Sequence, residues 1–270
     1  MNKNTSRLIV FLVIVASFFA GAKIALRFSD KSEKVLSERI ESTPTLSLSE
    51  KQTTPTPAAF FSTDKTAYPQ VKFFVMSFCP FGNQAEASLN LVYDLLKDKV
   101  SWQPFYVLAK DSTGSVSSLH GEQEFNQDLR EICLFKDEIS TSSAEVLSAT
   151  SSGQLSRWWN FVSLVNNNCT STNADSCWKK QALEIRLDAN KITTCTTQNR
   201  SAIIEEEIAE MQKYNVRSSP TVIINDKEYF GGRAPEDYKT AICSAFENLP
   251  PECNQTLGLI SQPLNSGCGN

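Results

Sequence analysis

The sequence predicts an α/β domain with a helical insertion, and three observations support this prediction. A strand–helix–strand pattern covers residues 71–108, and a helix, a β-hairpin and a last helix cover residues 198–246. Between them, over about residues 110–197, apolar residues recur only at helical spacing. Two βα halves separated by helices predict one sheet interrupted by a helical lobe.

The first strand and helix frame the residue with the clearest chemistry, Cys79. Residues 71–76 (Val-Lys-Phe-Phe-Val-Met) form a short apolar run, which is typical of a strand buried on both faces. The run leads into residues 77–80 (Ser-Phe-Cys-Pro), and proline suits a helix start because its missing N–H would be unpaired there. The helix then shows apolar residues at helical spacing: Ala85, Leu89, Val92 and Leu96. With a second strand at residues 100–108, Cys79 lies at the carboxyl end of the first strand, where α/β sheets place ligands.

The second half contains a helix, a hairpin and a last helix. A helix is expected from about residue 198 to 214. The β-branched run at residues 220–225 then turns at Asn225-Asp226 and continues over residues 227–230, which is the pattern of a β-hairpin. The last helix starts near Pro235, with acidic residues in its first turn.

The insertion is predicted from two helical stripes. Their apolar members are Leu129, Ile132, Cys133 and Phe135, then Leu155, Trp158, Trp159, Val162 and Val165. The paired tryptophans could form a binding surface, but aromatic pairs in an apolar helix are more often core. We expect core.

The N-terminus carries an addressing signal within residues 1–28. Lys3 and Arg7 precede an uncharged apolar run, which predicts either a signal peptide cleaved after residues 20–22 (Ala-Gly-Ala) or an uncleaved N-terminal membrane anchor. Residues 29–66 are rich in Ser, Thr and Pro and are expected to be a disordered linker. The folded domain is expected over residues 67–253, with a flexible tail at 254–270. The protein is therefore expected to be extracytoplasmic, either secreted or membrane-anchored.

Composition narrows the function classes. With 41% apolar residues, 21% charged residues and a net charge of −4, the chain can bury a core and stay soluble. Its basic residues are scattered, so nucleic acid is not an expected partner. Eight cysteines fit an oxidising compartment, and most are expected to form disulfides. The cysteines lack C-x-x-C spacing and the chain has one histidine, so neither a metal site nor a cofactor is expected.

Cys79 is the candidate catalytic residue because of its place at a helix start. A thiol there lies beside unpaired N–H donors and the positive end of the helix dipole, which favours the thiolate. This predicts an unbridged, nucleophilic thiol. The alternative is an inert or bridged cysteine in a fold that only binds partners.

Two segments resemble the thioredoxin superfamily. Residues 78–86 (Phe-Cys-Pro-Phe-Gly-Asn-Gln-Ala-Glu) are similar to the active-site motif of the exported DsbA-like branch, and Ser219-Pro220-Thr221 is similar to its second active-site loop. The resemblance implies that Cys79 attacks a substrate disulfide, with Pro80 and Phe81 completing the motif. Gly82 replaces the second cysteine of that motif, which puts the dithiol mechanism in doubt.

The resemblance also implies a role for the Ser219-Pro220 loop. In this superfamily the proline is cis and faces the nucleophilic thiol, and the residue before it pairs with an extended peptide. The alternative is that Pro220 only begins a strand.

Two further stretches are similar to particular families. Residues 120–124 (His-Gly-Glu-Gln-Glu) resemble the HG-x-x-E signature of lysosomal thiol reductases. Residues 158–161 and 241–253 resemble the thioredoxin-like part of plant vacuolar sorting receptors. His120 could therefore act as a base or a thiolate partner, or it could belong to a plain loop entering a helix.

The receptor resemblance also implies disulfides. It implies a Cys243–Cys253 bridge, and Cys169–Cys177 and Cys133–Cys195 follow as companion pairs in the insertion. Cys268 is then left over, in a tail without apolar periodicity. It could resolve mixed disulfides formed at Cys79, or it could be a tail thiol that forms intermolecular dimers.

Two functions follow from these patterns. In the first, the protein is a thiol–disulfide oxidoreductase or isomerase acting on exported protein or peptide substrates. In the second, it is a tethered peptide- or protein-binding module that has lost dithiol chemistry. Gly82 favours the second function, and the cysteine retained at a helix start favours the first.

Overall fold

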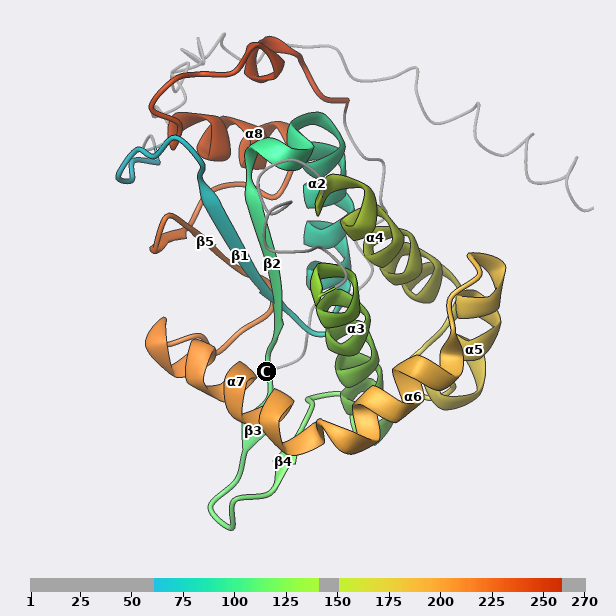
Figure 1. The fold of residues 1–270 in the computed structure, drawn as a ribbon. Coiled ribbons are helices and arrows are strands. Elements are labelled where there is room, and N and C mark those ends of the chain that lie inside the picture. Colours follow the sequence, from blue (N-terminus) through green and yellow to red (C-terminus); the bar gives the residue numbers. More distant parts are fainter. Residues whose placement is uncertain (1–60, 141–150, 259–270) are drawn as a thin grey trace, which may run out of the picture. The chain divides into compact units, whose positions relative to one another are not determined.

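The computed structural model describes residues 61–140 and 151–258 (Figure 1). The predicted export segment, residues 29–60 of the predicted linker, and Cys268 lie outside the described residues. Side chains are described from residue 155 onward in the second range.

A four-stranded sheet forms the centre of the fold, in the order β2-β1-β5-β6. β1 pairs in parallel with β2 and antiparallel with β5, which in turn forms a hairpin with β6. The strands are β1 (Gln70–Val75), β2 (Ser101–Tyr106), β5 (Thr221–Ile224) and β6 (Lys227–Tyr229). β1 thus has a neighbour on both sides, and the predicted βαβ unit and hairpin meet along it (Figure 1).

β1 is buried on both faces, as its apolar run predicts. Val71, Phe73 and Val75 belong to the larger core, together with residues of the helices α2 (Pro80–Leu96) and α8 (Pro235–Ser244). Phe74 lies in a second core with Phe105, and Met211 and Tyr214 pack against it from the α7 (Arg200–Lys213) end of the chain. Alternation along the strand therefore builds one core on each face of the sheet.

The segment between β2 and α7 is mainly helical. It contains a two-stranded ribbon, β3 (Ala109–Lys110) and β4 (Val116–Ser117), followed by α3 (Glu122–Ser140), α4 (Ser151–Asn168), α5 (Ala174–Glu184) and α6 (Ala189–Gln198). Two short 3₁₀ turns complete the described elements: η1 (Lys97–Lys99) and η2 (Pro251–Asn254). The predicted fold class, a thioredoxin-like α/β fold with a helical insertion, is confirmed.

The tryptophan pair belongs to the core, as expected. Trp158 and Trp159 are buried and pack edge to face, and Trp159 stacks on Phe73 of β1. This contact attaches the insertion to the central sheet.

Three disulfides join elements of the described chain. Cys133–Cys195 links α3 to α6, Cys169–Cys177 links the end of α4 to α5, and Cys243–Cys253 links α8 to η2. These are the three pairs expected from the sequence.

The start of the described chain is fixed by the β-hairpin turn. Asn225 accepts a hydrogen bond from the Gln70 amide at 2.8 Å and donates one to the Asp64 carbonyl at 2.8 Å. Thr66 also donates its amide to the Ala245 carbonyl at 2.9 Å. The segment before β1 is therefore held against the hairpin and α8.

Within residues 61–140 and 151–258, no helix is both long and apolar enough to span a bilayer. The predicted N-terminal anchor lies outside these ranges.

Candidate functional site

Cys79 caps the N-terminus of α2. Its backbone is extended and Pro80 occupies the first helical turn, as the sequence predicts. The Cys79 amide donates to the Met76 carbonyl at 3.1 Å, and the Asn83 amide donates to the Cys79 carbonyl at 2.8 Å. The side chain is fully buried. The sulfur therefore lies at the positive end of the α2 dipole and out of bulk water.

Cys79 is disulfide-bonded, so the expectation of an unbridged thiol is wrong. None of the described cysteines is unbridged. The six other described cysteines pair with one another, so none of them is the partner of Cys79. The sulfur is thus an electrophile toward an incoming thiolate, and helix-dipole stabilisation applies to the thiolate that exchange releases.

The Ser219-Pro220 loop faces Cys79. The peptide bond between its two residues is cis, as the resemblance implied. The Ser219 carbonyl oxygen lies 3.5 Å from the Cys79 sulfur, and the Ser219 hydroxyl accepts a hydrogen bond from the Met76 amide at 3.1 Å. Two segments 140 residues apart therefore meet at the sulfur.

Gly82 is buried against the same loop. A Cβ atom at this position would lie 2.6 Å from the Ser219 hydroxyl oxygen and 3.3 Å from the Met76 carbonyl oxygen. Ser219 therefore fills the volume that a side chain at position 82 would need. A second active-site thiol has no room here unless Ser219 moves.

Phe81 and Pro80 form the rim of the site. Pro80 is exposed, and Phe81 is half-buried with the Arg233 guanidinium 4.4 Å from its ring centre.

Sequence reasoning missed two buried carboxylates that hold the residues before Cys79. Asp128 accepts hydrogen bonds from the Ser77 amide at 3.1 Å and the Ser77 hydroxyl at 2.6 Å. Glu124 accepts one from the Phe78 amide at 2.9 Å. Both carboxylates come from α3, so the insertion fixes the approach to Cys79. The available signal was their spacing, since residues four apart share a face of a helix that also carries apolar residues.

His120 is linked to this loop through Glu124. Its Nδ1 lies 2.7 Å from one Glu124 oxygen, and its amide donates to the other at 2.9 Å. The structure thus brings His120 to a carboxylate that also binds the Phe78 amide. His120 lies in the loop that leads into α3, as the second of the two alternatives predicts. Its polar contacts are with Glu124 and not with the Cys79 sulfur.

The neighbouring carboxyls have raised pKa values because they are buried. Burial raises the pKa of Glu131 to about 7, although hydrogen bonds from Tyr106 and Gln127 oppose the shift. Burial, reinforced by the charge of Glu124, raises the pKa of Asp128 well above its usual range. Burial and the charge of Glu131 do the same for Glu86 on α2. Buried carboxyls with raised pKa values thus lie on both α2 and α3.

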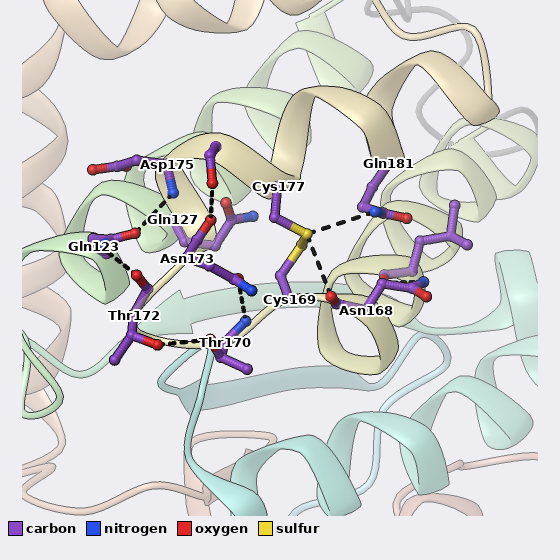
Figure 2. Close-up of a disulfide and its surroundings, with 12 residues drawn as sticks. Gln123, Gln127, Asn168, Cys169, Thr170, Thr172, Asn173, Asp175, Cys177 and Gln181 are labelled. Atoms are coloured by element: carbon purple, nitrogen blue, oxygen red, sulfur yellow. Dashed lines mark hydrogen bonds between the residues drawn. A yellow bond between two sulfur atoms is a disulfide. The ribbon is translucent and has the colours of Figure 1, made fainter. Parts of the chain in front are cut away.

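A groove of about 480 Å³ opens beside Cys79, between α2 and the end of α4. Phe78 and Pro80, the two neighbours of Cys79, line one end of it, and residues 169–171 line the other. Figure 2 shows how this second end is held by the Cys169–Cys177 disulfide. Gln123 of α3 donates to the Thr172 carbonyl at 2.8 Å and accepts from the Asp175 amide at 3.1 Å.

Within the described residues, no group of three or more His, Cys, Asp or Glu residues could hold a metal ion.

Comparison with known proteins gives one family match. The model of the family described as "Vacuolar sorting receptor thioredoxin-like domain" matches residues 106–243, just over half of the chain. Comparison with curated proteins gives no match.

Solved structures similar to this chain include two named DsbA and one named BdbD. Reduced DsbA from Mycobacterium tuberculosis is 16% identical with a TM-score of 0.46, covering 72% of this chain and 94% of that one. Oxidised BdbD from Bacillus subtilis is 15% identical with a TM-score of 0.43, covering 64% and 85%. Chlamydia trachomatis DsbA is 11% identical with a TM-score of 0.43, covering 75% and 93%.

Proposed function

This chain belongs to the vacuolar sorting receptor thioredoxin-like domain family, and from the surroundings of Cys79 we propose that it is an extracytoplasmic thiol–disulfide oxidoreductase or isomerase. It acts on exported proteins through Cys79. One observation carries the proposal: a disulfide-bonded sulfur at the N-terminus of α2 faces the Ser219-Pro220 loop. The apolar N-terminal segment and the three other disulfides support an oxidising, extracytoplasmic compartment.

The reaction is disulfide exchange with a reduced client protein. A client thiolate attacks the Cys79 sulfur, a client–Cys79 disulfide forms, and the former partner of Cys79 leaves as a thiolate. A second client thiolate then attacks the client sulfur, a client disulfide forms, and Cys79 leaves as a thiolate stabilised by the α2 N-terminus. The two client protons pass to the two protein thiols. A disulfide of the surroundings must reoxidise the protein for another cycle.

We assign Cys268 as the partner of Cys79. The support is counting: the chain has eight cysteines, Cys79 is bridged, and the other six described cysteines pair among themselves. Cys268 itself lies outside the described residues. With this partner, a cysteine far along the chain replaces the second active-site cysteine, whose position is occupied by Gly82.

The Ser219-Pro220 loop has the role of holding the client. The Ser219 carbonyl lies beside the Cys79 sulfur, so an extended client segment attached to that sulfur passes along this loop. Pro80 and Phe81 border the same approach.

A second candidate function is a peptide- or protein-binding module without redox turnover. The close approach of Gly82 and Ser219 favours it, because this contact leaves no room for a neighbouring resolving thiol. The site then binds extended segments and Cys79 serves only as a bridge.

The two functions are separated by mixing the oxidised full-length chain with an excess of a reduced two-cysteine peptide, without another oxidant. We expect close to one oxidised peptide per protein molecule, measured by mass spectrometry. Cys79→Ser and Cys268→Ser should each abolish it. The double variant Cys243→Ser/Cys253→Ser, which removes a bridge between α8 and η2, should retain it.

Full oxidation by Cys79→Ser would rule out the redox proposal. Full oxidation by Cys268→Ser alone would rule out the assigned partner. No oxidation by the wild type, with unchanged peptide binding in Cys79→Ser, would support the binding module instead.

A further inference from the structure

The groove between α2 and α4 contains buried polar atoms that have no hydrogen-bond partner among the described residues. Glu86 is 2% exposed and lines the groove from α2. Its Oε2 accepts a hydrogen bond from Asn166 Nδ2 at 2.7 Å, whereas its Oε1 has no partner. The Asn166 Oδ1 and the Trp159 Nε1 in the same lining also have none. A buried polar atom without a partner is costly, so these atoms indicate a ligand.

The unpaired oxygens of Glu86 and Asn166 call for a ligand that donates hydrogen bonds, whereas the Trp159 N–H calls for an acceptor. Both unpaired oxygens are acceptors, and Glu86 forms no ion pair within the described residues. The lining residues include no Lys or Arg, and Glu86 is their one acidic side chain. The other lining residues include four amides and three hydroxyls, which accept and donate without charge: Asn83, Gln84, Asn90, Asn167, Ser163, Thr170 and Ser171. A guanidinium or ammonium group would donate to both oxygens, and its positive charge would oppose the raised pKa of Glu86 and favour the carboxylate form.

The groove lies within reach of a client bonded to Cys79. Glu86 is seven positions after Cys79, two helical turns, so it lies on the same side of α2 about 10 Å farther along. An extended chain covers this distance in about three residues. The volume of about 480 Å³ holds a long side chain with room for solvent.

We propose that this groove is a specificity site, which binds an Arg or Lys side chain located within about three residues of the client cysteine. The inference rests on the proposed function, because it takes the client to be bound at Cys79. Glu86 binds the cation and Asn166 positions it. The Cys169–Cys177 disulfide keeps the far wall of the groove in place (Figure 2).

The test uses peptides that contain serine in place of cysteine, so that binding is measured without exchange. Each peptide carries Arg, its neutral isostere citrulline, or Glu two residues from the serine, and binding to the full-length chain is measured by calorimetry. We expect the Arg peptide to bind about tenfold more tightly than the citrulline peptide, and the Glu peptide more weakly than both. Glu86→Gln should reduce the Arg-to-citrulline ratio to near one. Glu184→Gln, an exposed change on α5, should leave it at about tenfold.

Equal binding of the Arg and citrulline peptides by the wild type would overturn the proposal, and this arm needs no variant to fold. An unchanged ratio in Glu86→Gln would also overturn it. A parallel arm with cysteine-containing peptides separates the two proposals. Peptide oxidation without an Arg preference would refute the specificity site alone. An Arg preference without peptide oxidation would refute the redox function alone.

Discussion

Gly82 and Ser219 share one small volume beside Cys79. The Ser219 hydroxyl oxygen lies 2.6 Å from the position that a Cβ on residue 82 would take, and it accepts the Met76 amide hydrogen bond. The two positions are therefore coupled, and a change at one determines what the other tolerates.

Gly82→Ala should destabilise the protein by about 1–2 kcal/mol, because the added methyl group must displace the Ser219 hydroxyl from the Met76 amide. Ser219→Ala should cost about 1 kcal/mol through the lost hydrogen bond. The double variant should cost clearly less than the two single costs added together. Urea unfolding of the four proteins measures this coupling, and strict additivity would contradict it.

At the scale of elements, α3 determines the conformation of the loop before Cys79. Glu124 accepts hydrogen bonds from the Phe78 amide, the His120 amide and the His120 ring, and Asp128 accepts two from Ser77. A helix of the insertion thus supplies the acceptors for a loop of the sheet domain. The HG-x-x-E segment has this structural role whatever else it does.

Glu124→Ala should lower the unfolding free energy by about 2–4 kcal/mol, because two backbone amides lose their acceptor in the interior. Glu122→Ala is the matched control on the same helical turn. Its side chain is exposed and forms a surface ion pair with Arg200, so its cost should stay within about 0.5 kcal/mol. Denaturant unfolding of both variants makes the comparison, and similar costs would show that Glu124 does not hold the loop.

Elements were predicted from the sequence far better than contacts between them. The strand at 71–76, the helix start at Pro80 and the hairpin at 220–230 depend on local patterns, and the structure has all three. The packing of Ser219 against Gly82 depends on residues far apart in the chain, which one sequence does not bring together. The groove depends on how α4 lies beside α2, and periodicity shows that a helix exists without showing which neighbour it faces.

At the scale of the whole molecule, buried carboxyls should make stability depend on pH. Burial raises the pKa of Glu207 on α7 to about 8, while the hydrogen bond from the Tyr106 amide opposes the shift. The unfolded chain loses this proton near the ordinary value of about 4.3, and the folded chain retains it up to about 8. The folded state therefore binds more protons between these values, and stability falls as pH rises through this window.

Glu207→Gln should remove part of this slope, because the amide oxygen still accepts from Tyr106 but no longer ionises. We expect the variant to be more stable than the wild type by on the order of 2 kcal/mol at pH 8 and nearly equal to it at pH 5. Glu206→Gln, whose side chain is 52% exposed, should shift stability little at either pH. Unfolding at pH 5, 6.5 and 8 without reductant tests this, and parallel curves for wild type and Glu207→Gln would refute it.

The hydrogen bonds that Asn225 forms with Gln70 and Asp64 fix the point at which the chain enters the domain. This point is the amino end of β1, whereas Cys79 follows the carboxyl end of that strand. Six residues of strand separate the two ends by about 20 Å. Residues 64–70 therefore lie at the end of β1 opposite the sulfur, and a solid support coupled through Asp64 would hold the domain from the side away from Cys79.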